Sequence, residues 1–409
     1  MPRTIPHTPT LAEARSHILA LAEPGESVEV SLVDALGLVL AEDAVADVDL
    51  PPFDRASSEG YAVRSVEATA GALLRVAGLR WSRRPFDDAL EPGEAIRVRP
   101  GDPLPEGADA VLPLADAKPD PETGPTRVVE VLRAVEGGSE VARRGHLLDA
   151  GEVLATAGTR LRPSMVGLLA SQGCVHPYCH RRVRVAVVAI GDHLVGPGEA
   201  PVMYRERNAA NASVAALALR AGAMPHDLQS VAVIDFARTL DRATSAPVIV
   251  VLGRRDRAVS RVYQEAGAEE VFRGVALKPG GRSSYLAIRD ESGRVAHHVF
   301  HLPLAPMAAA TAFTLLVQPL IARLQGEPAD APASTPALWE GEARRIGDRL
   351  RAVPVTLEVD AEARQVARPA TIRGLHDLAG FATADGLALL PERSGPRVGG
   401  EVVEVVRFP

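Results

Sequence analysis

The sequence predicts a multidomain protein that combines one α/β domain, built on a parallel sheet, with separate β-rich regions. Three observations predict this fold class. The chain has 409 residues, and a single hydrophobic core rarely extends over so many residues. Apolar runs alternate with helix-like segments between residues 183 and 326, which is the order of an α/β domain. Short β-like runs punctuated by proline and glycine fill much of the remaining chain, as in all-β regions.

The N-terminal elements are predicted from helical spacing and turn residues. A helix is expected over residues 11–22, and Thr10 is its expected N-cap because a Thr side chain accepts a hydrogen bond from the first helical turn. Short apolar runs between residues 28 and 145, such as EAIRVRP and TRVVEVLRAV, predict a β-rich region. A second helix is expected over residues 161–172.

The α/β region is predicted from three apolar runs, each followed by a helical pattern. A mostly apolar run is typical of a parallel strand that is covered on both faces. The runs are VRVAVVAIGD from residue 183, PVIVVLG at 247–253 and VAHHVFHLP at 295–303, and the helical patterns are NASVAALALRAG at 211–222, AVSRVYQEAG and MAAATAFTLLV. The Pro- and Ala-rich stretch 327–337 predicts a linker, and the tail from 346 to 409 is again β-rich.

Composition limits the partners and the compartment. The 45 basic and 52 acidic residues give a net charge of -7, which argues against a nucleic-acid partner. Two cysteines cannot form a disulfide framework, so we expect a reducing cytoplasm. The first residues lack the layout of a secretory signal. The stretch from Leu302 to Ala322 is uncharged, but its prolines and polar residues predict a loop and a buried helix, so no membrane partner is expected.

The ends of the three predicted strands form the first candidate site. Ligands bind beyond the carboxyl ends of parallel strands, which here means Gly191-Asp192, Gly253 and the segment that ends at Pro303. Glycine lets a ligand approach the backbone. Asp192 would lie near an anionic ligand only with a cation such as Mg²⁺ between them. The alternative, which spacing alone favours, is that Asp192 is the N-cap of a βα turn.

Two further segments carry charged side chains beside small residues. In residues 50–64, Asp54 and Glu59 flank two serines, and such acids could hold a metal or position a substrate. A surface loop is the preferred alternative. The segment KPGGR places Lys278 and Arg282 around Gly280, which suits a phosphate or another oxyanion. It lacks the spacing of a P-loop, and a solvated turn is equally compatible.

The run CVHPYCH, residues 174–180, holds two cysteines and two histidines. A structural zinc site usually needs a closer cysteine pair or a second pair, so we interpret the run as the connection into the α/β domain. His297 and His298 are adjacent on a predicted strand and point to opposite faces, so they do not chelate a metal well together.

Taken in order, several segments resemble the molybdopterin molybdenumtransferases, and the C-terminal domain of gephyrin is similar. They include PPFDRASSEGYAVR, IRVRPGDPLPEGADAVL, RVAVVAIGDHLV, FRGVALKPG and HLPLAPMAAATAFTLLVQPLIARLQG, and the resemblance covers nearly the whole chain. It implies a helical linker domain (residues 1–45 and 141–182), an inserted β-rich domain (46–140), an α/β molybdopterin-binding-like domain (183–326) and a C-terminal β-barrel (338–409).

The resemblance also implies an activity. Family members are homodimers that use Mg²⁺ and molybdate to insert molybdenum into adenylylated molybdopterin, and AMP is released. Carried onto this sequence, the catalytic and metal-binding acids are Glu59 and Asp192. The implied substrate-binding residues are Gly191, Gly253, Lys278, Gly280, Arg282 and Pro303.

The sequence departs from the family pattern at the expected site. Glu59 replaces a shorter acid, and the loop after the second strand is shorter, with Arg254 and Arg255 where the family has glycines. Leu304 replaces another glycine. Three hypotheses follow: a working insertase with an altered site, a catalytically degenerate paralogue that serves as a dimeric scaffold or binding protein, and a protein that binds a different nucleotide-like anion through the two arginines.

Overall fold

The computed structural model describes residues 7–79, 89–119, 128–328, 330–342, 347–394 and 399–408. The chain divides into two compact units. Unit 1 comprises Met1–Glu42, Ala157–Val166 and His176–Pro409, and unit 2 comprises Asp43–Thr156 and Gly167–Val175. This division differs from the four expected domains, whose boundaries remain a prediction.

The main sheet of unit 1 has six strands in the order β17-β14-β18-β22-β21-β19. The first four are parallel, and the last two join the edge through antiparallel pairs. Three of the parallel strands, those over 184–190, 248–252 and 295–302, match the three predicted apolar runs, whereas the complete sheet is mixed. The strands are β14 (Arg184–Ile190), β17 (Met224–Val231), β18 (Val248–Leu252), β19 (Glu269–Arg273), β21 (Ser284–Arg289) and β22 (Val295–Leu302).

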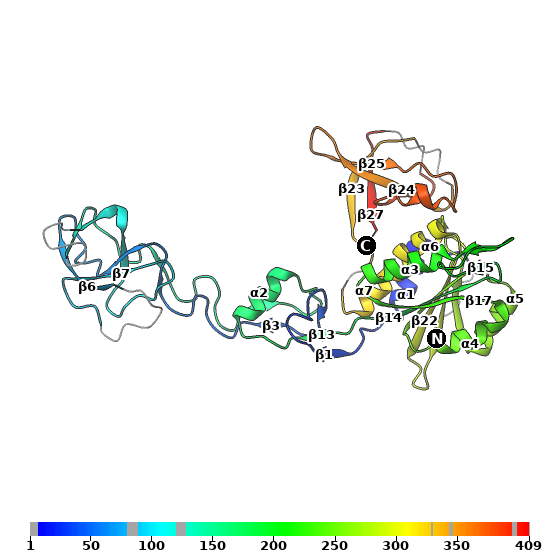
Figure 1. Ribbon diagram of the computed structural model, residues 1–409, viewed down its shortest axis with the longest axis horizontal. Coiled ribbons are helices and arrows are strands. Elements are labelled where there is room, and N and C mark those ends of the chain that lie inside the picture. The colour runs from blue at the N-terminus through cyan, green and yellow to red at the C-terminus, as the bar shows by residue number, and fades with distance from the viewer. Residues whose placement is uncertain are drawn as a thin grey trace. The chain divides into compact units, whose positions relative to one another are not determined.

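Helices cover both faces of this sheet (Figure 1). One face packs against α1 (Leu11–Leu19), α3 (Ala209–Arg220) and a continuous helical segment made of α6 (Pro306–Ala312), a π-helix (Phe313–Val317) and α7 (Gln318–Leu324). The other face packs against the 3-10 turn Val233–Asp235, α4 (Phe236–Ala243) and α5 (Arg257–Glu265). The central strand β18 is fully buried, as its apolar sequence predicted.

The first helix begins where the sequence predicted. Thr10 accepts a hydrogen bond from the backbone N–H of Glu13, and the Glu13 carboxylate accepts one from the N–H of Thr10, so the two residues form a capping box. The helix buries Leu11, Ala14 and Ile18 in the same core as the sheet. This packing links the N-terminal residues to the α/β body.

The long uncharged stretch is an internal helix. In the part of the chain that the structure describes, Pro306–Leu324 is the one helix that is long and apolar enough to cross a membrane, and 83% of its apolar window is buried inside the protein. Pro306 starts it, in the first-turn position where proline is tolerated. The expected loop followed by a buried helix is confirmed.

The C-terminal strands close into a barrel, because β24 pairs with both β25 and β26. The barrel strands are β23 (Ser334–Trp339), β24 (Leu350–Val359), β25 (Gln365–Pro369), β26 (Gly386–Leu390) and β27 (Val402–Arg407), with the short helix α8 (Leu378–Phe381) before β26. The strand β20 (Leu277–Lys278) pairs with β24 and joins the α/β body to the barrel sheet. The expected linker 327–337 was wrong in its last residues, because β23 starts at Ser334 and pairs with β27.

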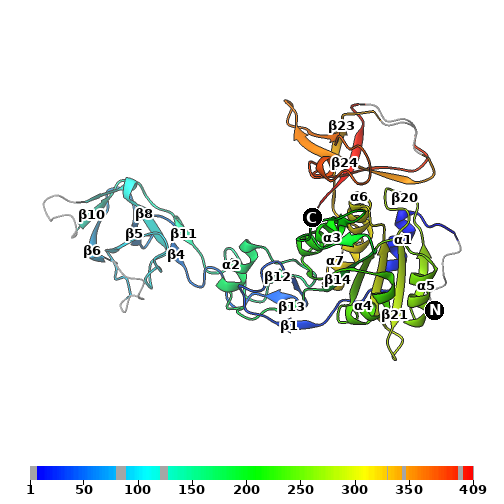
Figure 2. The ribbon, with the colours of Figure 1, turned by 45° about the vertical axis from the view of Figure 1, so that its right-hand side comes forward.

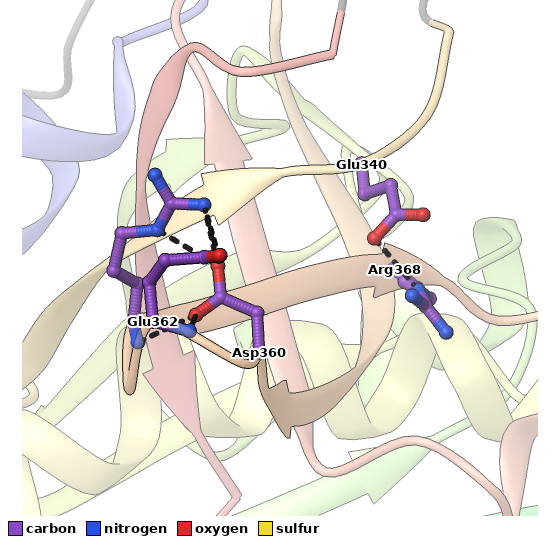
Figure 3. A network of polar contacts seen from close by, with 5 residues as sticks. Glu340, Asp360, Glu362 and Arg368 are labelled. Carbon is purple, nitrogen blue, oxygen red and sulfur yellow. Dashed lines mark hydrogen bonds and ion pairs between the residues drawn. The ribbon is translucent and has the colours of Figure 1, made fainter.

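Charged side chains form hydrogen bonds and ion pairs at and beside the hairpin between β24 and β25 (Figure 3). Asp360 accepts hydrogen bonds from the backbone N–H groups of Glu362 and Arg364, at 3.0 and 2.8 Å. The Arg364 guanidinium also donates to Asp360 at 2.8 Å, and these contacts lower the pKa of the Asp360 carboxyl. On β25, Arg368 lies 2.9 Å from Glu340. All these side chains are on the surface, so each pair contributes little stability.

Unit 2 is β-rich, as predicted. Its six-stranded sheet has the order β8-β5-β7-β6-β10-β9 and packs over a core that includes Tyr61 and Leu112. The strands are β5 (Gly60–Val63), β6 (Leu73–Leu79), β7 (Glu94–Val98), β8 (Ala110–Pro113), β9 (Ala117–Pro119) and β10 (Val128–Val131), with a 3-10 turn at Leu114–Asp116. Two smaller pairs are β4 (Arg55–Ala56) with β11 (Val141–Ala142), and β3 (Ala44–Val45) with β12 (Val153–Ala155).

Short elements connect the larger parts. The helix α2 (Pro163–Ser171) confirms the second predicted helix. A three-stranded sheet contains β1 (Ser27–Glu29), β2 (Val39–Leu40) and β13 (Tyr178–His180), and β15 (Leu194–Val195) pairs with β16 (Glu206–Arg207). Cys179 is buried within β13, and neither cysteine forms a disulfide. The run CVHPYCH therefore contains a strand that enters unit 1, which supports its interpretation as a connection.

Candidate functional site

The carboxyl ends of β14, β18 and β22 lie along one edge of the main sheet. Figure 2 shows β14 of this sheet beside α3 and α7. Backbone hydrogen bonds fix the residues just beyond two of these strands. The Gly191 N–H donates to the Val231 carbonyl at 3.0 Å, and the Gly253 N–H donates to the Leu302 carbonyl at 3.0 Å. Because Pro303 follows Leu302 directly, three of the predicted site residues are brought to the same edge.

Asp192 is exposed at this edge. Within the described residues, the structure shows no hydrogen bond or ion pair to its carboxylate. The alternative in which Asp192 is a helix N-cap is wrong, because α3 starts at Ala209 and its cap is Asn208. The segment between them forms a turn, the short strands β15 and β16, and an exposed loop. The carboxylate is therefore available to a ligand or a cation.

A buried amide network that the sequence did not predict holds the start of α3 against the sheet. Asn208 accepts a hydrogen bond from the N–H of Asn211 at 3.2 Å. The Asn211 side chain donates to Asp227 at 2.8 Å and to the Gln229 carbonyl at 3.1 Å. Two asparagines three residues apart at a helix start were the available signal, because asparagine is a favoured N-cap.

The loop after β20 packs on the helix that follows β22. Gly280 has φ +98, and a Cβ there would lie 3.3 Å from both the Ala308 carbonyl and the Ala312 Cβ, so only glycine fits. The side chains of Lys278 and Arg282 are exposed on either side. Two cations and a tightly turned glycine loop are thus placed beside the first turns of α6, which begins three residues after Pro303.

Gly253 has a structural explanation that requires no ligand. A Cβ at this position would lie 2.9 Å from the Ile190 carbonyl oxygen, so any side chain would displace the end of β14. The Gly253 carbonyl lies 3.2 Å from Nε2 of His301. Gly253 therefore sets the close approach of two adjacent strand ends, and binding to a substrate there remains a prediction.

Arg255 is turned back against the protein. It forms an ion pair with Glu270 of β19 at 2.5 Å, and only 10% of its side chain is exposed. Its guanidinium lies 5.3 Å from the centre of the Tyr263 ring on α5. Of the two arginines in the shortened loop, only Arg254 is exposed, which weakens the hypothesis that both bind a phosphate. Leu304 packs at the margin of the hydrophobic core.

Two buried histidines on β22 each face a tyrosine. Nδ1 of His301 lies 2.9 Å from the Tyr263 hydroxyl, and Nδ1 of His298 lies 2.7 Å from the Tyr285 hydroxyl. Burial lowers the pKa of each histidine to about 4, so both are neutral at pH 7. His297 instead lies 3.0 Å from the Ala246 carbonyl. The prediction that His297 and His298 do not act as a chelating pair agrees with these separate contacts.

In unit 2, Glu59 is paired with an arginine that the sequence analysis did not select. Nη2 of Arg97 donates to Glu59 at 2.9 Å, and the Arg97 guanidinium lies 5.5 Å from the Tyr61 ring centre. The hydrogen bond to Glu59 raises the pKa of Arg97. Arg97 is opposite Tyr61 in the β5–β7 register. The sequence alone does not show which residues of two strands lie opposite each other.

Asp54 and Glu59 do not form a carboxylate pair. Asp54 accepts a hydrogen bond from the backbone N–H of Arg144 at 2.7 Å, whereas Glu59 contacts Arg97. Glu59 belongs to unit 2, and Asp192, Lys278 and Arg282 belong to unit 1. The structure thus brings the candidate site residues of unit 1 to one edge of the main sheet. The contacts of Glu59 are formed within unit 2.

Comparisons with known proteins identify the family. The model of the MoeA N-terminal region (domain I and II) matches residues 9–173. The chain is 32% identical over 343 residues to molybdopterin molybdenumtransferase 1 of Mycobacterium tuberculosis, covering 76% of this chain and 77% of that protein. The chain belongs to the molybdopterin molybdenumtransferase family.

Other family members extend the match over the whole length. The molybdopterin molybdenumtransferase of Haemophilus influenzae is 26% identical over 414 residues, with 98% of both chains covered. The molybdopterin biosynthesis moeA protein from Pyrococcus horikosii superposes with a TM-score of 0.83 at 26% identity, and each chain is covered completely. Both the predicted family and the predicted multidomain fold are confirmed.

The Mg²⁺ that the family implies can be tested against the available donors. Among the described residues, no group of three or more His, Cys, Asp or Glu side chains could hold a metal ion. Mg²⁺, however, commonly binds through one or two carboxylates together with waters and substrate phosphates. An exposed carboxylate with no protein partner among the described residues, as at Asp192, fits that mode, whereas Glu59 already has a cationic partner.

Proposed function

We propose that this family member inserts molybdenum from molybdate into adenylylated molybdopterin and releases AMP. The supporting observation is the open Asp192 carboxylate on the same sheet edge as the loop between β19 and β21, which carries the exposed Lys278 and Arg282 side chains. An acid and two cations along one sheet edge suit a ligand that carries both phosphate and a divalent cation. The role in molybdenum cofactor biosynthesis follows from the family, and the degenerate scaffold is the less favoured alternative.

The residues at the sheet edge have different proposed roles according to their charge. Lys278 and Arg282 bind the substrate phosphates, and the turn at Gly280 lets the substrate approach the backbone. The turns at Gly191 and Gly253, together with Pro303, form the surface of the proposed binding site at the strand ends. Asp192 would hold Mg²⁺, which would supply positive charge to offset that of the substrate phosphates. Glu59 and Arg97 form a charged pair whose carboxylate is held in one orientation for the insertion step.

The proposal includes a homodimer in the cytoplasm. The family resemblance supports the homodimer, and the low cysteine content, which suggests a reducing compartment, supports the cytoplasm. Sedimentation of the purified chain measures the first, and a mass equal to one chain would contradict it.

The direct test is release of AMP by the purified chain with adenylylated molybdopterin, molybdate and Mg²⁺. We expect Asp192→Asn to lower the rate by about tenfold or more and to raise the Mg²⁺ concentration needed, because the substitution removes a charged metal ligand. The matched control is Asp241→Asn on α4, whose side chain is also exposed and which should keep the full rate.

The second variant tests the acid of unit 2. Glu59→Gln should lower the rate of AMP release without changing the Mg²⁺ requirement, and Glu136→Gln, an exposed acid of the same unit, should have no effect. If the folded wild-type chain releases no AMP under any molybdate or Mg²⁺ concentration, the insertase proposal is wrong and the degenerate paralogue is favoured.

A further inference from the structure

A cavity in unit 1 lies on a different part of the molecule from the strand-end site. Its volume is about 450 Å³, and it is lined by one face of α1, by Arg323 near the end of α7 and by the chain at Asp330 and Ala331. Figure 1 shows α1 and α7 next to each other, and the two helices are in contact. This volume is in the range of small-molecule sites, roughly 300–1,000 Å³.

Two arginines without full sets of partners face this cavity. Arg15 is half-buried, and within the described residues the structure shows no hydrogen bond or ion pair to it. Arg323 donates through Nη2 to Asp330 at 2.8 Å, whereas its Nε is buried and has no hydrogen-bond partner in the described part of the chain. A buried donor without a partner is costly, because its lost hydration is not replaced. Because Nε of Arg323 is buried, the groups that can donate hydrogen bonds to an additional anionic oxygen are Arg15 and the exposed part of the Arg323 side chain, which is 32% exposed.

The contact between Asp330 and Arg323 indicates that the cavity can bind a carboxylate or a similar anionic group. Its carboxylate is 81% exposed and reaches Arg323 from the chain that follows α7. It pairs with Arg323 as an external carboxylate or phosphate would, while Arg15 has no such partner among the residues that the structure describes. Two guanidinium groups against one carboxylate leave a positive charge, and Leu19, Ala20 and Ala331 supply apolar surface beside it.

We propose that this cavity, the α1–α7 groove, binds a small organic anion whose carboxylate or phosphate contacts Arg15 and Arg323 and whose apolar part lies on Leu19 and Ala20. Arginine suits this task because its planar group binds both kinds of oxyanion through paired hydrogen bonds. The site is independent of the proposed insertase activity, since none of its lining residues belongs to the sheet edge.

Calorimetric titration of the purified full chain tests the groove. The probes are phenyl phosphate, benzoate and inorganic phosphate, with benzyl alcohol as the neutral probe. We expect phenyl phosphate or benzoate to bind more tightly than inorganic phosphate, and benzyl alcohol not to bind. The comparison of phenyl phosphate with benzoate identifies the preferred oxyanion. If neither phenyl phosphate nor benzoate binds to the wild type or to the Asp330→Asn variant, the proposal is overturned.

Variants with opposite expected effects separate binding from a structural role. Arg15→Ala should weaken binding about tenfold or more, whereas Asp330→Asn should strengthen it, because it removes a competing charge from Arg323. Arg238→Ala, an exposed arginine on α4, should leave it unchanged. If all three substitutions weaken binding equally, the effect is a general one of charge and the proposal is refuted. If Arg15→Ala changes the sedimenting mass, Arg15 lies in a contact between subunits and the proposal is also refuted.

Discussion

At the residue scale, specific neighbours contact the buried histidines and Arg255 near the sheet edge, although Nε and Nη1 of Arg255 are buried without a hydrogen-bond partner among the described residues. His301 faces Tyr263 and the Gly253 carbonyl, and His298 faces Tyr285. Arg255 is neutralised by Glu270 and lies over the Tyr263 ring. These contacts explain residues that a sequence shows only as isolated polar positions within apolar runs. Asp192, at the same sheet edge, takes no part in these contacts, so its carboxylate is open to a ligand.

The two buried histidines predict a loss of stability in mild acid. Their pKa values of about 4 in the folded chain are below the ordinary value of about 6.5. The unfolded chain therefore binds protons first, and stability that is present above about pH 6.5 is lost as the pH falls towards 4. Between pH 7 and 5, each histidine should remove roughly 2 kcal/mol from the free energy of unfolding.

Urea unfolding at pH 7 and pH 5 measures this effect. The double variant His298→Gln/His301→Gln should lose less stability between the two pH values than the wild type does, although it is less stable at pH 7. His376→Gln, at an exposed position, serves as the control and should keep the wild-type pH dependence. An unchanged pH dependence in the double variant would contradict the assignment.

At the element scale, boundary residues set where the helices and strands begin. The capping box at Thr10 and Glu13 starts α1, Asn208 starts α3, and Pro306 starts the buried helix. The edge strand β17 was not predicted because many of its residues are exposed or only partly buried, so its sequence lacks a continuous apolar run. The antiparallel β19 and β21 were missed because no apolar run as long as that of β14 marks them.

Loss of the cap should destabilise α1. Thr10→Ala removes the side-chain oxygen that accepts from Glu13, and we expect the free energy of unfolding to fall by about 1 kcal/mol. Thr8→Ala is the matched control, because Thr8 is exposed and outside the helix. Chemical denaturation measures both, and equal effects of the two substitutions would be inconsistent with a capping role.

At the scale of the whole molecule, the chain builds separate cores. Unit 1 has a core on each face of the main sheet and another in the barrel, and unit 2 has a core around Tyr61 and Leu112. Each unit is formed by segments that are distant in the sequence. Separate cores predict that the two units unfold as distinct cooperative transitions.

Core truncations should therefore affect one transition each. Leu112→Ala should lower the melting temperature of the unit 2 transition, and Leu316→Ala that of the unit 1 transition, with about 2–5 kcal/mol lost in each case. Both leucines are fully buried. Differential scanning calorimetry separates the transitions, and a shift of both transitions by either substitution would argue against independent units.

The sequence by itself determined three of the four parallel strands, the helix starting at Leu11, the buried uncharged helix and the family, because apolar periodicity, capping residues and ordered motifs are local signals. Only the tertiary structure decided that Arg97 pairs with Glu59, that Arg255 turns towards Glu270 and that Arg15 and Arg323 share a cavity. These partners are distant in the chain or belong to different elements, and such contacts depend on strand register and helix packing, which no local pattern specifies.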